Sequence, residues 1–291
     1  MTRPLDRLTP SELVTVYRKS AKKRFGQHFL TDPRILNAIV DSVHVEEGED
    51  VLEIGPGCGT LTSQLIARGA KVRAIEIDRD AATFLKEQFV QHGELELIEG
   101  DALRVDMKEI LETSQGKKWK CTANLPYNVG TPIFFELTKH RAHFESMALM
   151  FQKEVAERMV ATPEERKDYG VLSLMTHLYH DARIHMTLPP GAFSPPPKVD
   201  SALIVLHPIE ASRIPDPTLR KLFTRVVKAA FQQRRKTLSN ALKSICQDKE
   251  LLLSCMEEAG IEAKSRAEVV DFDGFVKLSS ALFASSLSGD A

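Results

Sequence analysis

The sequence predicts an α/β fold, in which strands alternate with helices, followed by a small C-terminal all-helical domain. Short apolar runs alternate with helical patterns up to about residue 210, and a glycine-rich turn follows the first buried run. Only helical patterns come after Pro208. Such alternation is typical of βαβ units and a parallel sheet. We therefore expect a basic N-terminal arm over residues 1–24, an α/β domain over 25–210 and a helical domain over 211–291.

The expected elements follow from hydrophobic periodicity and turn residues. The expected strands are residues 50–54, 71–77, 95–98, 119–123, 147–151, 182–188 and 201–206. The expected helices are residues 35–43, 60–65, 79–90, 132–138, 153–160, 169–179, 219–231, 236–246, 249–259 and 272–283. The last two strands suit a terminal hairpin.

The composition excludes several classes of protein. Charged residues are 27% of the chain but the net charge is −1, so an anionic partner must be met by local basic patches. The four cysteines form no C-x-x-C pair, which argues against a disulfide framework or a structural zinc and fits a reducing compartment. No apolar run approaches the ~20 residues of a membrane span. We expect a cytoplasmic chain without a membrane partner.

The ends of the first three strands carry glycines and acids in an informative order. The turn Gly55-Pro56-Gly57-Cys58-Gly59 lies between a buried strand and a helix, which is typical of dinucleotide or nucleoside sites. Its G-x-G-x-G spacing differs from the phosphate-binding G-x-G-x-x-G and suits a ligand without a pyrophosphate. Glu76 follows about 20 residues later, where an acid can take ribose hydroxyls. Asp101 can accept a hydrogen bond from an adenine amine.

Each of these features has a plainer interpretation. Many glycine turns are only tight turns, and an acid after a strand is often a helix cap. Asp78 suits the capping role better than Glu76, because a helix is expected from residue 79. Three strand ends with Gly, Glu and Asp in order are more specific than any one of them.

The stretch Asn124-Leu125-Pro126-Tyr127 ends the fourth expected strand. An amide oxygen and a neighbouring backbone carbonyl can together accept two hydrogen bonds from one NH2 group. A Tyr ring beside them can stack on a flat base. The stretch therefore suits an adenine whose exocyclic amine is held at the edge of the sheet. Taken alone, a proline turn with an Asx cap is the simpler interpretation.

Two further segments suggest contacts with nucleic acid. Basic runs occur at Arg18–Arg24 and around Arg234-Arg235-Lys236, and either can be a solvated face or an RNA-backbone site. The first run leads into residues 25–30, an aromatic segment that we expect to pack on the main domain and close over a ligand. A proline-rich loop presents Phe193, which either faces Tyr127 across a target base or merely belongs to a connection between edge strands.

The chain resembles the ribosomal RNA adenine dimethyltransferases that act on the small subunit. The matching segments are F-G-Q-H-F-L, L-E-I-G-P-G-C-G-T-L-T, I-E-I-D-R-D, E-G-D-A-L, N-L-P-Y-N-V, Q-K-E-V-A-E-R and F-S-P-P-P-K-V-D-S-A. They occur in the family order between Arg24 and Leu206, and the helical tail fits as well. His28 stands where many members carry Asn, and Cys58 where Leu or Ala is usual.

The resemblance implies S-adenosylmethionine as cofactor and no metal. Carried over position by position, it implies a donor pocket lined by Gln27, His28, Leu30, Gly55, Gly57, Glu76, Ile77, Asp101, Ala102 and Asn124. It implies a catalytic group of Asn124, Leu125, Pro126, Tyr127 and Phe193. The implied partner is small-subunit rRNA in a pre-30S particle, bound partly by the helical domain, and the chain is expected to act as a monomer without an obligate protein partner.

The implied reaction places two methyl groups on the exocyclic amine of each of two adjacent adenosines near the 3′ end of small-subunit rRNA. Two alternatives remain open. One is a binding protein that kept the fold and lost the chemistry, against which the intact Asn124, Tyr127, Glu76 and Asp101 argue. The other is an adenine methyltransferase acting on DNA or on large-subunit rRNA, with nearly the same chemistry at the strand ends.

Overall fold

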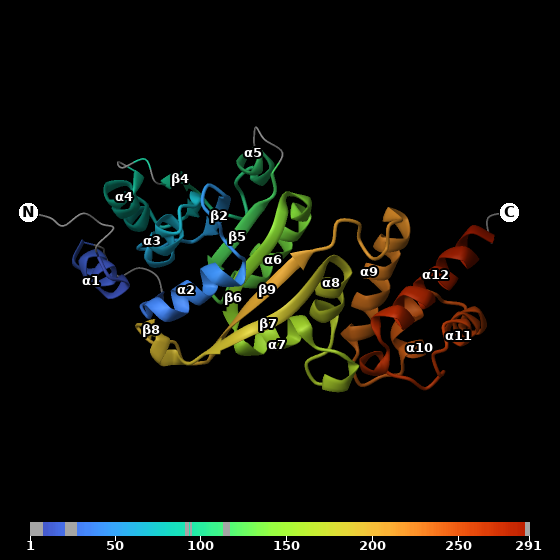
Figure 1. The fold of residues 1–291 in the computed structure, drawn as a ribbon. Helices are drawn as coiled ribbons and strands as arrows, with labels where there is room; N and C mark the ends of the chain where they lie inside the picture. Colours follow the sequence, from blue (N-terminus) through green and yellow to red (C-terminus); the bar gives the residue numbers. More distant parts are fainter. Residues whose placement is uncertain (1–7, 21–27, 91–92, 94, 113–116, 289–291) are drawn as a thin grey trace, which may run out of the picture. The chain divides into compact units, whose positions relative to one another are not determined.

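A computed structural model describes residues 8–20, 28–90, 93, 95–112 and 117–288 (Figure 1). The chain forms two compact units, one of Met1–Ala156 with Arg183–Pro208 and one of Glu157–Ala182 with Ile209–Ala291. The expected boundary at residue 210 lies close to the observed one at Pro208. Residues 157–182 were expected in the α/β domain, but they cluster with the C-terminal helices.

The first unit contains a seven-stranded sheet in the order β4-β3-β2-β5-β6-β9-β7. Its strands are β2 (Asp50–Ile54), β3 (Lys71–Glu76), β4 (Leu95–Glu99), β5 (Trp119–Asn124), β6 (Phe144–Gln152), β7 (His180–Leu188) and β9 (Ser201–Pro208). The pairs β4–β3, β3–β2, β2–β5 and β5–β6 are parallel, and β6–β9 is antiparallel. The expected α/β fold is confirmed, as is the pairing of the last two expected strands.

Burial along the strands explains their places in the sheet. From Ser146 to Phe151, β6 is buried at every position, as expected for a strand covered on both faces. Strand β7 alternates between exposed and less exposed residues, which is typical of an edge strand. The carboxyl ends of β2, β3, β4 and β5 lie along one edge because these strands are parallel neighbours.

Four helices of the first unit connect its parallel strands: α3 (Thr60–Ala67), α4 (Arg79–Gln88), α5 (Met107–Leu111) and α6 (Gly130–Lys139). Two helices, α1 (Pro10–Ser20) and α2 (Pro33–Ser42), precede β2, and α7 (Lys153–Val160) follows β6 and continues into the second unit. Asp32 caps α2, with Pro33 in its first turn, and Asp78 caps α4. Both caps agree with the sequence, because a carboxylate satisfies backbone N–H groups that the first turn leaves unpaired.

The expected basic arm contains a packed helix. Helix α1 buries Leu13, Val14 and Tyr17 in the core of the first unit. The sequence analysis assigned no helix to this arm, because the hydrophobic residues of α1 were not distinguished from the basic run that follows them. Residues 21–24 of the basic run lie outside the described part of the chain.

The second unit is helical. Its helices are α8 (Val171–Tyr179), α9 (Pro217–Gln232), α10 (Leu238–Ala241), α11 (Lys249–Glu258) and α12 (Phe272–Ser288). Phe223 and Phe275 are fully buried in this unit. The helix expected at residues 236–246 is shorter and ends in a 3-10 turn at Leu242–Ser244. Within the described ranges, no helix is long and apolar enough to cross a membrane.

Candidate donor and target-base site

The glycine turn after β2 has a backbone shape that favours glycine. Gly55, Gly57 and Gly59 have φ angles of 68°, 60° and 81°, which L side chains rarely adopt. A Cβ on Gly57 would lie 2.8 Å from a ring carbon of Phe29, so the absence of a side chain also allows this close packing. A Cβ on Gly55 would meet nothing within 4 Å. The turn is therefore closed at Gly57 and open at Gly55, where a ligand can approach the backbone.

Glu76, the last residue of β3, holds its carboxylate in a fixed orientation. The Gly57 N–H donates to Oε2 at 2.9 Å and the Asp78 N–H donates to Oε1 at 2.8 Å. Burial raises the pKa of Glu76, and these two backbone hydrogen bonds oppose that rise. The Glu76 side chain thus links the turn after β2 to the end of β3. Its two oxygens still have lone pairs that can accept hydrogen bonds from a ligand.

The end of β4 lies beside Glu76, since the Gly100 N–H donates to the Glu76 carbonyl at 2.9 Å. Asp101 accepts a hydrogen bond from the Leu103 N–H at 2.9 Å, and Ala102 is buried. Ile77 is 62% exposed, which makes it an apolar surface next to two acids. A flat nucleoside base needs such a combination of apolar contact and hydrogen-bond acceptors.

Asn124 ends β5 with its side chain oriented by a backbone contact. Its Nδ2 donates to the His28 carbonyl at 2.9 Å. Because the amide nitrogen is used in this way, the amide oxygen is the group left to accept a hydrogen bond from a ligand. Leu125 is buried, whereas Pro126 is exposed and forms the turn that follows.

Tyr127 is half-buried and anchored at its hydroxyl. The Tyr127 hydroxyl lies 2.6 Å from Ser201 Oγ, and burial raises the pKa of the phenol. The ring lies nearly parallel to the His28 ring, at 24°, with the centroids 6.1 Å apart. The predicted amine acceptor and the predicted stacking ring thus both contact His28.

Comparisons with known proteins identify the family. A sequence model of the ribosomal RNA adenine dimethylases matches residues 18–282. The chain belongs to this family. It is 43% identical over 270 residues to the ribosomal RNA small subunit methyltransferase A of Pseudomonas aeruginosa, covering 92% of this chain and 96% of that one. It is 39% identical over 280 residues to the protein of that name from Clostridium botulinum, covering 95% and 99%.

Solved structures agree with the fold of this dimethylase. A dimethyladenosine transferase from Plasmodium falciparum superposes with a TM-score of 0.71 at 29% identity, covering 86% of this chain and 96% of that one. The 23S rRNA methyltransferase ErmE has a TM-score of 0.67 at 22% identity, covering 88% and 99%, and supports the Rossmann-like fold alone. Membership of a methyltransferase family implies S-adenosylmethionine as the donor. The open backbone at Gly55, the fixed Glu76 carboxylate and the exposed Ile77 fit that nucleoside.

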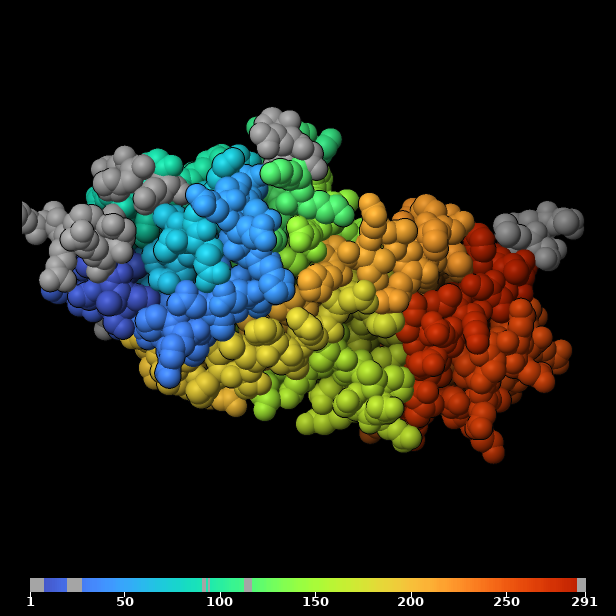
Figure 2. Space-filling model, viewed as in Figure 1, coloured from blue at the N-terminus to red at the C-terminus, as the bar shows by residue number. Residues whose placement is uncertain are grey.

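The described part of the aromatic segment, residues 28–30, packs on the first unit. Strand β1 (Phe29–Leu30) pairs antiparallel with β8 (Phe193–Ser194), so Leu30 lies opposite Phe193. Figure 2 shows the blue N-terminal part of the chain bordering the yellow part near residue 190. Leu30 is 1% exposed, which leaves its backbone rather than its side chain for a ligand. Gln27, also predicted in the donor pocket, lies outside the described residues.

Phe193 is the remaining residue of the predicted catalytic group. Its side chain is only 4% exposed and belongs to the hydrophobic core of the first unit. The Phe193 side chain is therefore closed to solvent in this structure, and its place opposite Tyr127 across a target base stays a prediction. The ring that faces Tyr127 belongs to His28.

Helix α1 covers the donor edge of the dimethylase through Tyr17. The Tyr17 ring makes edge contacts with Phe29 and Phe84, with centroids 5.6 and 5.3 Å apart. Its hydroxyl lies 3.5 Å from an Asp78 carboxylate oxygen. Burial and the negative charges of Asp78 and Glu76 raise the pKa of Tyr17, so the phenol stays neutral.

Glu53 was missed by the sequence analysis. It lies in β2, is 2% exposed and accepts a hydrogen bond from the Thr62 hydroxyl at 2.7 Å. Burial raises its pKa to about 8, with a smaller contribution from the charge of Glu76. An acidic residue within an apolar strand, just before a glycine turn, was the sequence signal from which a buried carboxyl group could have been predicted.

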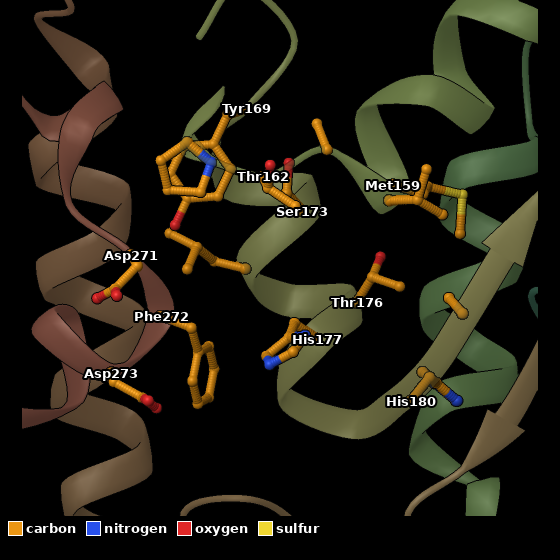
Figure 3. Close-up of a pocket in the computed structure, with 15 residues that line it drawn as sticks. Met159, Thr162, Tyr169, Ser173, Thr176, His177, His180, Asp271, Phe272 and Asp273 are labelled. Atoms are coloured by element: carbon orange, nitrogen blue, oxygen red, sulfur yellow. The ribbon is translucent and has the colours of Figure 1, made fainter. Parts of the chain in front are cut away.

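The second unit contains a separate cavity of about 280 Å³ (Figure 3). Thr176, His177 and Phe272 are among the residues that line it, and no predicted donor or target residue does. Burial and the charge of Arg213 lower the pKa of His177. Among the described residues, no group of three His, Cys, Asp or Glu side chains is placed to hold a metal ion.

Proposed function

We propose that this chain transfers methyl groups from S-adenosylmethionine to the exocyclic amines of two adjacent adenosines near the 3′ end of small-subunit rRNA, giving N6-dimethyladenosines. The observation that carries the proposal is the orientation of Asn124. Its amide nitrogen is fixed on the His28 carbonyl, so the amide oxygen is available at the edge where β2, β3 and β5 end. A preoriented acceptor beside a donor site is what an adenine amine requires.

On the donor side, Glu76 would accept from the ribose hydroxyls and Asp101 from the adenine amine of the donor. Ile77 and Ala102 would contact its base. Gly55 would approach its amino-acid end, Gly57 would serve the pocket by holding the Glu76 carboxylate, and the segment of Gln27, His28 and Leu30 would close over it. S-adenosylmethionine supplies a methyl group activated by a sulfonium.

On the target side, the adenine amine is a poor nucleophile because its lone pair is delocalised into the ring. Hydrogen bonds to the Asn124 amide oxygen and the Leu125 carbonyl would draw the nitrogen toward tetrahedral geometry and localise that lone pair. Pro126 fixes the turn that presents the carbonyl. Tyr127 would stack on the base, which must leave its own stack to enter the site. Alignment of the two reactants can supply several kcal/mol of the rate enhancement.

The RNA backbone would be bound by basic residues of both units, and the helical region from residue 211 onward would supply much of that surface. Arg235 and Lys236 are exposed and suit phosphate contacts. Arg234, predicted in the same role, donates to the carbonyls of Arg166, Lys167 and Tyr169, so it holds a loop. We further propose that the chain works as a monomer on the assembling small subunit.

The test uses small ribosomal subunits that lack the modification. Incubation with labelled donor, followed by mapping of modified bases, should give dimethyladenosine at two adjacent positions near the 3′ end. Asn124→Ala should abolish most of the label, whereas Asn128→Ala, at an exposed position four residues on, is the matched control and should retain it. Label confined to other positions of the small-subunit rRNA, or none with the parent protein, would contradict the proposal.

A further inference from the structure

The cavity of the second unit lies against one face of α8 (Figure 3). Ser173, Thr176 and His177 line it, and their spacing of three and four residues places them on the same face of the helix. Residues 159–163 and 271–273 line it from other segments. All of these residues belong to the second unit. The volume of about 280 Å³ admits a small ring molecule, since a cavity of about 150 Å³ holds benzene.

The Thr176 hydroxyl is a buried polar group in the lining of this cavity. Thr176 is 1% exposed, and its Oγ1 makes no hydrogen bond to any described residue. Thr83, Thr138 and Thr224, which also lie within helices, each donate to the carbonyl four residues earlier. A buried hydroxyl without a partner is unfavourable, and a threonine that its own helix does not hold can turn about χ1 toward a ligand. Thr176 therefore supplies a polar contact for a molecule in the cavity.

The charge around the cavity is negative. Asp271 and Asp273 line it and are exposed, and none of the described residues that line it is a lysine or an arginine. Burial and the charge of Arg213 lower the pKa of His177, so its imidazole is neutral near pH 7 and does not offset the two carboxylates. Arg213 itself is paired with Asp181. The polar groups of the cavity are therefore mostly acceptors, and they favour a ligand with N–H donors and a positive charge.

Apolar and aromatic side chains form much of the remaining lining. Met159 and Leu174 are buried, and the rings of Tyr169 and Phe272 line the same cavity. The Tyr169 hydroxyl donates to the Val270 carbonyl at 3.0 Å, so this ring is held in place. Aromatic rings attract cations, and apolar side chains favour a flat organic body over a hydrated metal ion. The lining thus combines the features of a site for an organic cation.

We propose that this cavity binds a small planar organic cation, an amidinium or guanidinium ion carried on an apolar body. Its N–H groups donate to the Thr176 hydroxyl and to the carboxylates of Asp271 and Asp273. Its apolar body lies against Leu174 and Phe272. Phosphates and nucleotides are disfavoured because the same carboxylates repel them. The predicted donor and target residues that the structure describes all belong to the first unit, so the inference goes beyond methyl transfer and does not depend on it.

Benzamidine, benzamide and benzoate test the proposal, because they have nearly the same shape and are cationic, neutral and anionic. Each is titrated into the full-length protein at saturating S-adenosylhomocysteine, which keeps the donor site occupied, and binding is followed by NMR. We expect benzamidine to bind with a Kd of about 1 mM or lower, and benzoate to bind at least about tenfold more weakly, with benzamide between them. Failure of benzamidine to bind, or equal binding of benzoate, would overturn the inference.

Two substitutions locate the binding. Thr176→Val removes the hydroxyl, keeps a similar shape and should weaken benzamidine binding about fivefold or more. The melting temperature of this variant should equal or exceed that of the parent, since it no longer buries an unpaired hydroxyl. Asp273→Asn should weaken binding about 2- to 5-fold. Thr224→Val and Glu258→Gln, at positions outside the cavity in the same unit, are the matched controls and should bind benzamidine as the parent does. Unchanged affinity in both Thr176→Val and Asp273→Asn would show that benzamidine binds elsewhere, and the inference would fail.

Discussion

Glu53→Gln should change how the stability of the protein depends on pH. The Glu53 carboxyl group is fully buried in β2, and its pKa rises from 4.5 in an exposed position to about 8 in the folded protein. Between these values the folded protein keeps a proton that the unfolded chain releases. The free energy of unfolding therefore falls as pH rises through this window, by about 1.36 kcal/mol per pH unit for this group, and levels off above pH 8.

The whole window corresponds to at most about 5 kcal/mol, and the part from pH 6 to 8 to about 3 kcal/mol. The glutamine side chain of the variant cannot ionise and still accepts a hydrogen bond from Thr62. The variant should therefore gain stability relative to the parent as pH rises, because the parent has to take up a proton at Glu53 in order to fold, or to bury a charge above its pKa. The gain should be smallest near pH 6 and largest above pH 8.

Urea unfolding at pH 6.0, 7.0 and 8.5 measures the difference directly, because other titrating groups contribute equally to both proteins. Glu87→Gln, at an exposed position on α4, is the matched control and should give the same difference from the parent at each pH. A Glu53→Gln difference that stays constant from pH 6.0 to 8.5 would show that Glu53 is already ionised, and the argument from burial would fail.

Three further outcomes test the site. Glu76→Ala should weaken donor binding by about 2 kcal/mol or more, measured by calorimetry, since it removes a charged acceptor; unchanged affinity would remove Glu76 from the donor site. Asn124→Ala should lower the single-turnover rate at least a hundredfold with little change in RNA affinity. Tyr127→Phe should lower the same rate only slightly and Tyr127→Ala should lower it strongly, because stacking on the base needs the ring and not the hydroxyl. Reversing the charges of Arg235 and Lys236 should weaken RNA binding and reduce its dependence on salt concentration. An unchanged salt dependence would show that the two side chains are solvated and do not contact RNA phosphates.

The sequence predicted the order of elements well because each parallel strand is a continuous apolar run. β2, β3 and β5 are buried along most of their length, so most of their residues are apolar. Such continuous apolar runs are easier to recognise as strands than the alternating pattern of a half-exposed strand. The caps Asp32 and Asp78 were also predictable, since capping depends on local backbone geometry. The spatial order of the strands was not, because pairing between distant segments leaves no local pattern.

Side-chain partners were harder to predict than elements. The run Arg234-Arg235-Lys236 contains three cations that are all exposed, yet Arg234 donates hydrogen bonds to three backbone carbonyls of another loop. Tyr17 directly precedes a basic run and was assigned no partner from the sequence, whereas its ring is buried against Phe29 and Phe84. In both cases the residues that contact the side chain lie more than 10 positions away in the sequence, so a local pattern does not predict the contact.

Strand β8 shows why burial of a site residue is hard to predict from the sequence, since Phe193 is buried and Ser194 next to it is partly exposed. Successive side chains in a strand point to opposite faces, so a shift of one residue in register exchanges the face that meets a ligand. Phe193 pairs with Leu30, and both side chains are buried. The Pro195 carbonyl, in the loop that follows, lies against His28, and the hydroxyl of Ser201, the first residue of β9, lies against Tyr127. The proline-rich segment therefore contacts the site through a backbone carbonyl and a serine hydroxyl. The orientation of these two groups cannot be predicted from the residue pattern. We therefore expect substitutions in this segment to change the rate of methyl transfer by changing the positions of the His28 and Tyr127 rings.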